Sequence, residues 1–293
     1  MKLALIVATR NRPAELRRLL ESLASQSRKP DRVVIVDSSD TPVSAVLKSA
    51  DGLAIECLRH WPPSASGQRN AGLARVSGDC DLIGFVDDDA VLEPDAIERM
   101  LEFWETAPAD AAGAGFNPLN QEWRLGPRTW WLTEKLGLYS RRPGSVAPSG
   151  CQAVFGRVAQ DLEVDWLPST AVVWRAEVVR KRRFDEFFDG YSYLEDVDFS
   201  YGLRPAWRLY VVAGAGYWHY PSAGGRISAR RFGQVEVRNR LYFVEKHGLC
   251  PVRCRAALGI RAGMTLIQGI LGLDRLALTR FLGNLEALFG LCR

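Results

Sequence analysis

Apolar residues follow two different rhythms along the first part of the chain. Leu3 to Ala8 and Val33 to Val36 are apolar without interruption, as strands buried on both faces are. Between them, leucines recur at the three- and four-residue spacing of one helical face, behind a proline suited to a first helical position. The pattern therefore predicts a helix from Pro13 to Leu23 between two buried strands.

The same alternation continues beyond the second strand. Strands are predicted over 53–58 and 82–86, and helices over 68–76 and 94–104. A strand, helix, strand order predicts parallel βαβ units with right-handed crossovers. The expected fold class is therefore α/β, with a mainly parallel sheet flanked by helices.

Periodicity is lost between Ala107 and Gly156, where Pro, Gly and Trp are frequent. A long irregular region over a binding site is expected there. Regular elements are predicted again downstream, with strands at 170–174 and 209–212 and helices at 176–182, 194–203 and 230–247. The tail from Arg255 to Leu291 is rich in Leu, Ile, Ala and Gly and has few charges, so a helical tail is expected.

The composition fits a folded chain with a sizeable core. Of 293 residues, 47% are hydrophobic and 25% are charged. The net charge of +4 does not suggest a nucleic-acid-coating protein. Positive charge is concentrated between Arg226 and Arg261, where nine basic residues are opposed only by Glu236 and Glu245. This segment is suited to phosphates, either on a substrate or on a membrane surface.

The cysteines and the N-terminal run indicate a cellular compartment. Six cysteines are scattered without a CxxC pair, and Cys250 and Cys254 lack a second pair to complete a zinc site. Free thiols in a reducing cytosol are favoured. The N-terminal apolar run lacks a small-residue cleavage site and is interpreted as a strand, not a signal peptide. The expected location is the cytoplasm, including the cytoplasmic face of a membrane.

Three adjacent carboxylates, Asp87, Asp88 and Asp89, come directly after the buried strand at 82–86. Such neighbours repel each other unless a cation is present. At the carboxyl end of a parallel strand they lie where open α/β sheets bind ligands. Carboxylate oxygens suit Mg²⁺ or Mn²⁺ bridging a diphosphate, so a metal site is predicted. An acidic solvated turn before Pro94 is the alternative.

Two later segments also carry candidate chemistry. Glu195 and Asp196 lie at a predicted helix start, where a carboxylate projecting into a cleft is able to act as a general base. The alternative is that these acids only stabilise the positive end of the helix. His219 follows a strand among aromatic residues and is either a further metal ligand or a packed, hydrogen-bonded histidine.

The first strand-to-helix turn, Thr9-Arg10-Asn11-Arg12-Pro13, has neither GxGxxG nor GxxxxGK[ST]. A dinucleotide fingerprint and a P-loop are therefore excluded. Asp37, at the end of the second strand, is a candidate for hydrogen bonding a base or ribose, or else a turn former. Arg69 is a candidate phosphate contact at the same edge. No GxSxG or HExxH motif supports a hydrolase or a zinc protease.

Taken in order, these segments resemble the family 2 glycosyltransferases of the GT-A fold, of the inverting, rhamnosyltransferase-like kind. The resemblance runs from Leu3 to about His247. It rests on six stretches: 6–12 resembles the opening V-x-T-Y-N-R, 34–37 the second strand with its Asp, 67–72 the A-R-N-x-G helix start, 87–89 the DxD motif, 184–186 with 195–198 the F-D-E…E-D-x-D pattern, and 218–222 the late histidine.

The resemblance implies a role for each matching residue. Asp89 would hold the divalent metal, with His219 in its shell, and Asp88 would contact the ribose or the metal shell. Asp196, the Asp of the ED pair, would be the catalytic base. The residues expected to bind the nucleotide-sugar are Thr9, Arg10, Asn11, Asp37, Arg69, Asp87, Asp88 and Glu195.

Three departures from the family pattern narrow the expectation. Arg10 replaces the usual Tyr, and 204–207 reads Arg-Pro-Ala-Trp where R-x-x-G-W is common. The Q-x-x-R-W motif of processive synthases is absent around Gln234. A single-addition transferase is therefore favoured over a polymerising synthase.

The resemblance also implies an activity, partners and a domain layout. The enzyme would be a metal-dependent inverting glycosyltransferase of the hexosyltransferase type (EC 2.4). It would move a sugar from a nucleotide-diphosphate donor to a saccharide or lipid-linked acceptor, in cell-surface polysaccharide or glycolipid synthesis, without nucleic acid. The GT-A domain is expected at 1–248, with a nucleotide-binding half at 1–105 and an acceptor-binding half at 106–248. A helical C-terminal extension is expected at 249–293.

Two features of the later sequence allow two interpretations each. The apolar tail from Gly263 to Leu291 either lies on an anionic membrane or packs as a helical hairpin on its own domain or on a second subunit of a homodimer. Four tryptophans in or beside the irregular region suit either an acceptor platform or core packing. They are Trp123, Trp130, Trp131 and Trp166.

Two other functions use parts of the same pattern. A sugar-nucleotide nucleotidyltransferase also uses aspartates and a metal, but opens with a Gly-rich loop that 9–13 does not resemble. A non-catalytic nucleotide-sugar binding module would have no need of Asp89, Asp196 and His219 together.

Overall fold

The computed structural model describes the chain except for residues 48–51, 77, 79, 123–130, 223–226 and 292–293. The chain divides into two compact units. The first, which we call the sheet unit, comprises Met1–Trp123 and Phe155–Gly225. The second, the helical unit, comprises Arg124–Val154 and Arg226–Arg293.

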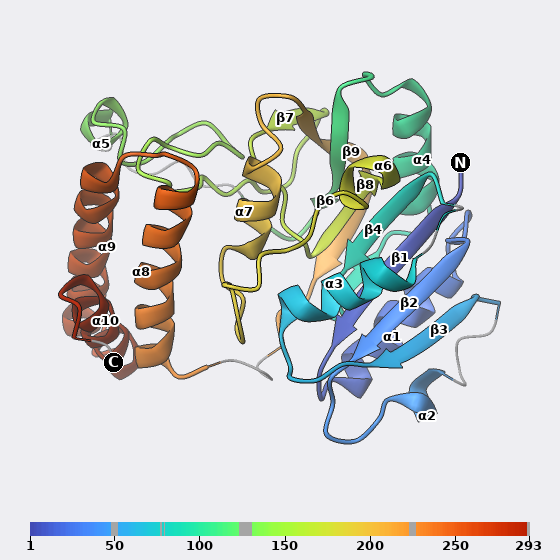
Figure 1. Cartoon of the computed structure of the whole chain (residues 1–293), viewed down its shortest axis with the longest axis horizontal. Helices are drawn as coiled ribbons and strands as arrows, with labels where there is room; N and C mark the ends of the chain where they lie inside the picture. Colours follow the sequence, from blue (N-terminus) through green and yellow to red (C-terminus); the bar gives the residue numbers. More distant parts are fainter. Residues whose placement is uncertain (48–51, 77, 79, 123–130, 223–226, 292–293) are drawn as a thin grey trace. The chain divides into compact units, whose positions relative to one another are not determined.

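The described strands of the sheet unit form one nine-stranded sheet in the order β3-β2-β1-β4-β8-β6-β9-β5, with β7 paired to β9 (Figure 1). The strands β3, β2, β1 and β4 are mutually parallel, whereas β8 runs antiparallel to both β4 and β6. The bounds are β1 (Leu3–Thr9), β2 (Arg32–Asp37), β3 (Ile55–Arg59), β4 (Leu82–Val86), β5 (Ala90–Leu92), β6 (Ala111–Pro118), β7 (Leu162–Val164), β8 (Ala171–Arg175) and β9 (Arg208–His219). The predicted α/β class, with a mixed sheet and flanking helices, is confirmed.

Side chains alternate across the sheet and build a core on each face. Leu3 and Leu5 of β1 belong to the core that contains the leucines of α1 (Pro13–Ala24). Ala4 and Ile6, which point to the other face, belong to the core that contains Leu73 of α3 (Ala65–Arg75). The remaining helices of this unit are α2 (Ser44–Leu47), α4 (Ala96–Thr106), α6 (Ala176–Val179) and α7 (Glu195–Tyr201). Because both faces are covered, the strands are apolar throughout, which is the pattern that the sequence displays.

One sequence expectation is wrong in part. Within the region from 107 to 156, expected to be irregular, residues Ala111–Pro118 form β6, every residue of which is buried. Its sequence is rich in Gly and Ala because bulky neighbours occupy the space above the strand. A Cβ atom added to Gly113 would lie 2.5 Å from the ring of Trp174. The short strands β5 and β7 were also not predicted, and β9 extends beyond the predicted 209–212 to His219.

A bulge in β9 shifts the register between this strand and β6. Val212 pairs with Phe116, but the next residue of β6, Asn117, pairs with Gly216. The Asn117 amide donates a hydrogen bond of 2.8 Å to the Ala213 carbonyl oxygen within the bulge. Beyond it, β9 pairs with β5, with His219 opposite Ala90.

The helical unit contains α5 (Trp131–Lys135), α8 (Ala229–Lys246), α9 (Pro251–Leu271) and α10 (Arg275–Leu288). Glycines allow α8 and α10 to approach closely, because a Cβ atom at Gly233 or Gly283 would lie closer than 3.0 Å to backbone of the other helix. Glu236 of α8 is fully buried and forms ion pairs with Arg261 of α9 and Arg280 of α10. The three helices are thus joined by close backbone contact and by one buried charge cluster.

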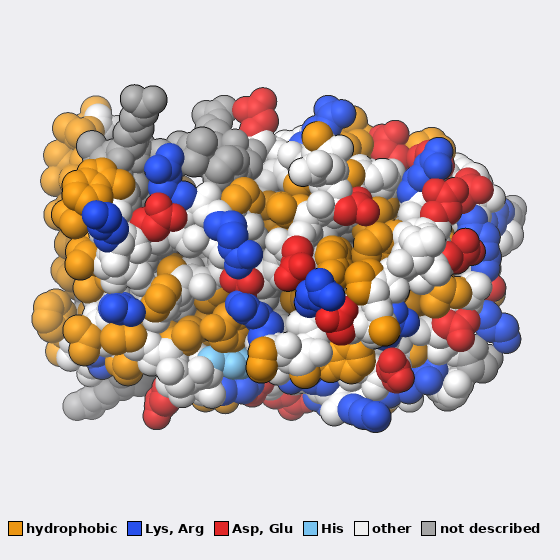
Figure 2. Space-filling model, turned by 90° about the horizontal axis from the view of Figure 1, so that it is seen from above, with side chains coloured by type: hydrophobic (Ala, Val, Ile, Leu, Met, Phe, Trp, Pro, Cys, Tyr) orange, Lys and Arg blue, Asp and Glu red, His pale blue; other side chains and the backbone are white. Residues whose placement is uncertain are grey.

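Part of the surface of this helical unit is apolar. Hydrophobic side chains gather over α9 and α10, at the left of the space-filling view (Figure 2). Within the described part of the chain, none of the helices combines the length and apolar character needed to cross a membrane.

Candidate functional site

The carboxyl ends of the parallel strands bring the first-turn residues to the acidic triplet. Ile6 of β1 pairs with Phe85 of β4, so Thr9 and Asp88 follow at matching positions three residues later. The Thr9 hydroxyl donates a hydrogen bond of 2.8 Å to Asp88 Oδ2. Both side chains are buried. Two predicted site residues are therefore in direct contact at the predicted edge of the sheet.

Strand pairing also brings Asp89 to His219. Asp89 directly precedes β5, and His219 lies opposite the first residue of that strand, Ala90. His219 Nε2 lies 3.3 Å from Asp89 Oδ1. The Ser222 amide donates to Asp89 Oδ2 at 3.3 Å. Although burial works in the opposite direction, the hydrogen bond from His219 holds the pKa of Asp89 below its ordinary value.

Two amide side chains orient His219 from the other side. Asn120 donates to the His219 carbonyl oxygen at 2.7 Å and accepts from its amide at 3.0 Å. Gln121 Nε2 lies 3.1 Å from His219 Nδ1. Because the side-chain amide of Gln121 has both a donor and an acceptor end, it is able to support either tautomer of the ring.

Arg12 provides the counter-charge for the triplet. Its Nη1 atom lies 3.0 Å from Asp88 Oδ1 and 3.4 Å from Asp89 Oδ2. Burial nevertheless raises the pKa of Asp88 to about 7, against the opposing effect of Arg12. The sequence analysis assigned no role to Arg12. Arg12 and Asp88 are 76 residues apart in the chain, so local pattern does not reveal their contact.

Arg69 joins the triplet to the ED pair. Its guanidinium donates to Asp87 Oδ1 at 3.0 Å and to Glu195 Oε1 at 2.8 Å, and the residue is only 5% exposed. The preceding Gln68 donates to the carbonyl oxygens of Thr9 and Val36 at 3.0 and 2.8 Å. These bonds fix the start of α3 to the ends of β1 and β2, and so they fix the position of Arg69.

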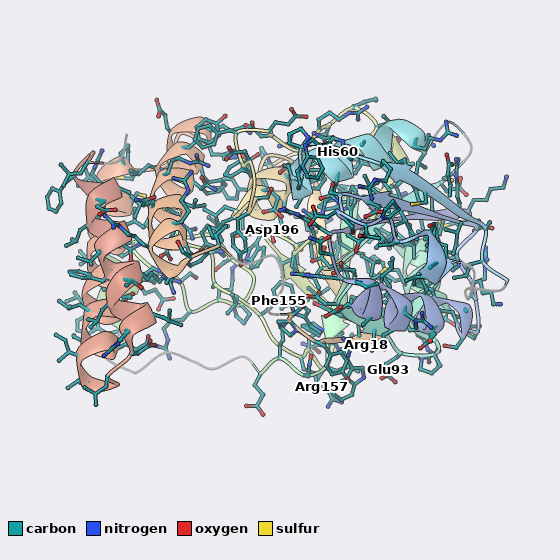
Figure 3. All side chains as sticks on the ribbon, turned by 90° about the horizontal axis from the view of Figure 1, so that it is seen from below. Arg18, His60, Glu93, Phe155, Arg157 and Asp196 are labelled. Atoms are coloured by element: carbon teal, nitrogen blue, oxygen red, sulfur yellow. The ribbon has the colours of Figure 1, made fainter. Side chains whose placement is uncertain are left out.

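Asp196 lies at the start of α7, on the side of that helix toward the sheet (Figure 3). Burial raises its pKa to about 6, and the charge of Asp87 adds to this rise. Burial also raises the pKa of the neighbouring Glu195, helped by the charge of Asp196. A carboxylate with a pKa near neutrality is suited to act as a general base.

The loop before α7 holds two residues in a strained backbone conformation. Ser192 has φ 50° and Leu194 has φ 77°, both in the left-handed region. Residues other than glycine rarely adopt this backbone conformation, which costs about 1–3 kcal/mol at each residue. Asn11, in the β1–α1 turn, has φ 55°. Within the described residues of the sheet unit, the non-glycine residues in this conformation therefore fall in the two loops that carry candidate site residues.

Asp37, at the end of β2, is enclosed by the loop that follows it. It is fully buried, accepts from the Ser39 and Val43 amides at 2.8 and 3.1 Å, and pairs with Arg59 at 2.6 Å. Although burial opposes it, the hydrogen bonds from Ser39 and Val43 hold the pKa of Asp37 below its ordinary value. Its carboxylate thus shapes the loop after β2, and Arg59, which the sequence did not single out, is the more exposed partner.

The remaining predicted residues lie in the β1–α1 turn. Asn11 exchanges hydrogen bonds with Asp40, at 2.8 Å from its amide nitrogen and 2.9 Å to its amide oxygen. This links the turn to the loop after β2. Arg10 is exposed at the same edge.

The donor set around Asp89 fits a divalent cation only with help from a ligand. Among the described residues, no group of three or more His, Cys, Asp or Glu side chains is placed to hold a metal ion. Asp89 and His219 supply one carboxylate and one imidazole, a combination that Mn²⁺ accepts. Diphosphate oxygens and water would have to complete the shell, as is usual for metals that bridge nucleotides.

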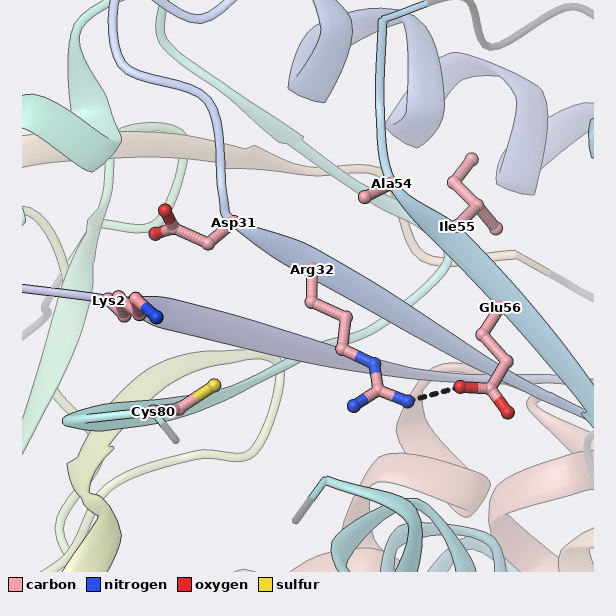
Figure 4. Close-up of a pocket in the computed structure, with 7 residues that line it drawn as sticks. All are labelled: Lys2, Asp31, Arg32, Ala54, Ile55, Glu56 and Cys80. Atoms are coloured by element: carbon pink, nitrogen blue, oxygen red, sulfur yellow. Dashed lines mark hydrogen bonds and ion pairs between the residues drawn. The ribbon is translucent and has the colours of Figure 1, made fainter. Parts of the chain in front are cut away.

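A pocket of about 530 Å³ lies at the opposite edge of the sheet (Figure 4). Its lining comes from the amino ends of the strands and includes Lys2, Arg32 and Cys80. Arg32 is paired with Glu56 across its floor. This pocket is therefore remote from the triplet and has no part in the site.

The tryptophans divide between the two interpretations. Trp166 is 6% exposed and packs on Phe155 with 5.8 Å between ring centroids, which favours a core role. Trp131, in the helical unit, is 53% exposed. Trp123 and Trp130 lie outside the described residues.

Comparison with known proteins identifies the type of domain. The model of the family described as glycosyl transferase family 2 matches residues 4–161. The chain is 34% identical over 108 residues to the uncharacterized glycosyltransferase YwdF of Bacillus subtilis, a match that covers 36% of this chain and 40% of that protein. It is 28% identical over 284 residues to the succinoglycan biosynthesis protein ExoM of Rhizobium meliloti, covering 90% of this chain and 83% of that protein.

Solved structures share the fold at low sequence identity. A mannosyltransferase of Pyrobaculum calidifontis, PcManGT, in complex with GDP-Man and Mn²⁺, matches with a TM-score of 0.59 at 14% identity, over 99% of this chain and 87% of that chain. S. aureus TarS 1–349 in complex with UDP-GlcNAc matches with a TM-score of 0.55 at 19% identity, over 88% and 70% respectively. These likenesses agree with the expected GT-A fold.

Proposed function

This chain belongs to glycosyl transferase family 2, and from this premise we propose that it is a metal-dependent, inverting glycosyltransferase that uses a nucleotide-sugar. The donor is a nucleotide-diphosphate sugar and the acceptor is a hydroxyl group. In this proposal residues 1–105 bind the donor and residues 106–248 bind the acceptor. A rhamnose-type donor is one candidate among several.

One observation carries the proposal. Arg69 bonds Asp87 on one side and Glu195 on the other, and so places the acidic triplet beside the ED pair. The guanidinium is buried and bonded to both carboxylates, so in this proposal it holds the two acidic segments together. The proposed base and the acids proposed to act at the leaving group therefore come from adjacent segments of one site.

Asp89 and His219 are the residues that would hold the cation. A bound Mg²⁺ or Mn²⁺ would neutralise charge on the departing nucleoside diphosphate. Asn120 and Gln121 keep the imidazole in place. Arg12 supplies one positive charge beside Asp88 and Asp89, on the side of the first turn.

Asp196 is the proposed base. Its carboxylate takes the proton of the acceptor hydroxyl as the acceptor oxygen forms a bond to the anomeric carbon. The bond from that carbon to the diphosphate oxygen breaks at the same time, and the nucleoside diphosphate leaves with the electron pair. A single in-line displacement of this kind inverts the anomeric centre.

One relative supports a proposal for the acceptor class. ExoM is named for succinoglycan biosynthesis. By likeness to it, we propose that this enzyme acts in the synthesis of a cell-surface polysaccharide or glycolipid. The complex of TarS with UDP-GlcNAc supports a nucleotide-sugar donor. The absence of the processive motif supports the addition of one sugar at a time.

The test measures nucleoside diphosphate release from a panel of UDP-, GDP- and dTDP-sugars with Mn²⁺, with and without saccharide acceptors. Wild-type protein is expected to release nucleoside diphosphate, and Asp196→Asn to lose about 10²–10⁴-fold in kcat while keeping the donor dissociation constant. Glu177→Gln, an exposed carboxylate-to-amide change on α6, serves as the matched control.

Three results would contradict the proposal. Wild-type turnover in Asp196→Asn would exclude Asp196 as the general base. Release of pyrophosphate instead of nucleoside diphosphate would indicate a nucleotidyltransferase. If the protein binds a donor but releases no nucleoside diphosphate, either with an acceptor or without one, it is a binding module.

A further inference from the structure

One exposed face of α9 is apolar from Ile260 to Leu271. Ile260, Met264, Ile267 and Leu271 follow each other at spacings of four, three and four residues, so they lie on one side of the helix. Their exposed fractions rise from 39% at Ile260 to 81% at Leu271. A soluble surface helix normally presents polar residues on this side.

The apolar face continues into the turn between α9 and α10. Leu271, Leu273 and Leu276 are 81%, 88% and 70% exposed. Leu273 has φ 50°, a left-handed conformation that leucine rarely adopts. The hairpin tip thus holds three leucines outward, where they gain nothing from packing on this chain.

Positive charge surrounds this surface. From Lys246 to Leu273 the sequence contains no Asp or Glu, but it contains Arg253, Arg255 and Arg261, the last of which is paired with Glu236 of α8. Arg253 and Arg255 are exposed, and Arg253 lies seven residues, about two helical turns, before Ile260 on the same face. Arg275 follows directly after the hairpin tip and is also exposed.

The charge of the whole chain is divided between the two units. The described residues of the helical unit contain 13 Lys and Arg against 5 Asp and Glu, a formal charge of +8. Those of the sheet unit contain 20 against 27, a formal charge of −7. The net charge of +4 for the whole chain therefore combines an acidic sheet unit with a strongly basic helical unit, and the helical unit carries the exposed apolar face.

A second copy of the chain fits this surface less well than a bilayer. In a two-fold symmetric contact the same patch meets itself, so Arg253 and Arg275 would face like charge. The acids of α10 and its N-cap are engaged within the unit: Glu286 is paired with Arg230, and Asp274 accepts from the Leu276 and Ala277 amides. An anionic bilayer offers negative headgroups for the arginines and an acyl boundary for the leucines.

We propose that the α9–α10 hairpin docks on the surface of an anionic membrane, with its leucine tip and the Ile260–Leu271 face in the headgroup–acyl boundary. The helices lie on the bilayer and do not cross it. This inference does not depend on the transfer chemistry, because it rests on the helical unit alone.

The test is flotation of the full-length protein with vesicles of phosphatidylcholine alone and with 3:1 phosphatidylcholine and phosphatidylglycerol. Binding to the anionic vesicles is expected to exceed binding to the neutral ones by at least about tenfold, and to weaken in 0.5 M salt. The triple change Leu271→Ser, Leu273→Ser and Leu276→Ser is expected to abolish flotation, and Arg253→Gln with Arg255→Gln to remove the preference for anionic vesicles.

Matched controls separate the patch from general effects. Val154→Ser removes an exposed apolar side chain elsewhere in the helical unit, and Arg17→Gln with Lys181→Gln removes two exposed positive charges from the sheet unit. Both are expected to float as wild type does. Thermal melts check that every variant is folded.

The proposal is overturned if the protein stays unbound at every lipid concentration, or binds neutral and anionic vesicles equally. It is also overturned if the leucine variant floats like wild type. Light scattering adds a further outcome: a dimer that the leucine changes convert to a monomer would assign the face to a second copy of the chain.

Discussion

At the scale of single residues, the site balances charge with protein groups before any ligand arrives. Arg12 contacts both Asp88 and Asp89, and His219 contacts Asp89. Burial of Asp88 and Asp89 is tolerable for this reason. The arrangement implies that a divalent cation competes with a guanidinium for the same oxygens.

Replacing Arg12 is therefore expected to strengthen metal binding. Arg12→Gln removes the competing cation, so the affinity for Mn²⁺ without nucleotide should rise severalfold in a calorimetric titration. Arg10→Gln, in the same turn, is the control and should bind Mn²⁺ as wild type does. An unchanged or weaker affinity in Arg12→Gln would show that the guanidinium and the metal do not share a site.

The activity is expected to depend on pH through Asp196. Burial raises the pKa of this carboxylate to about 6, and a general base works only when it is unprotonated. kcat/KM should therefore fall as the pH is lowered through about 6, by about tenfold for each further pH unit. The check is a rate profile from pH 5 to 8, with circular dichroism at each pH to confirm folding. A flat profile down to pH 5 would count against Asp196.

At the scale of secondary-structure elements, most of the fold could be predicted from periodicity. Buried parallel strands and amphipathic helices have distinct apolar patterns, and β1, α1, β2 and β4 match their predictions within a residue or two. β6 could not be predicted, because Gly and Ala give a strand no pattern of its own. Its place is decided by Trp174, which comes much later in the chain.

The candidate site was predictable in part for the same reason. Asp87–Asp89 directly follow a predicted strand, so local pattern was enough to find them. The pairing of Asp89 with His219 depends on the β5–β9 register, and β5 has only three residues. Only the order of motifs along the chain, through the family resemblance, indicated that these residues belong together. Gln121 and Arg12 carry no local signal and follow from the contacts alone.

The close contact between α8 and α10 makes a further prediction. At Gly283 a Cβ atom would be forced against the Arg230 backbone, so Gly283→Ala should destabilise the protein by about 2 kcal/mol. At Gly263, on the open side of α9, nothing lies within 4 Å, so Gly263→Ala should stabilise by about 0.5–1 kcal/mol. Chemical denaturation measures both. Equal effects of the two substitutions would contradict the close contact.

At the scale of the whole molecule, the division of charge governs how the protein meets charged surfaces. A basic helical unit and an acidic sheet unit should give an orientation to any encounter with a polyanion. The interaction is electrostatic at a distance, so it should be sensitive to ionic strength.

Cation-exchange chromatography at pH 7.5 provides a direct measurement. Arg253→Gln with Arg255→Gln should elute at clearly lower salt than wild type. Arg17→Gln with Lys181→Gln removes the same net charge from the acidic unit and should shift the elution much less. Equal shifts for both pairs would mean that net charge alone, and not its distribution, determines retention.

The bulge between Val212 and Gly216 has one more consequence. Side chains along a strand alternate between faces, so the number of residues in the bulge decides which face His219 occupies when it reaches β5. Removing one residue there would leave the hydrophobic part of β9 untouched but deliver Tyr220 opposite Ala90 and turn the imidazole away from Asp89. The length of an irregularity in the middle of β9 thus determines whether His219 lies on the same face as Asp89.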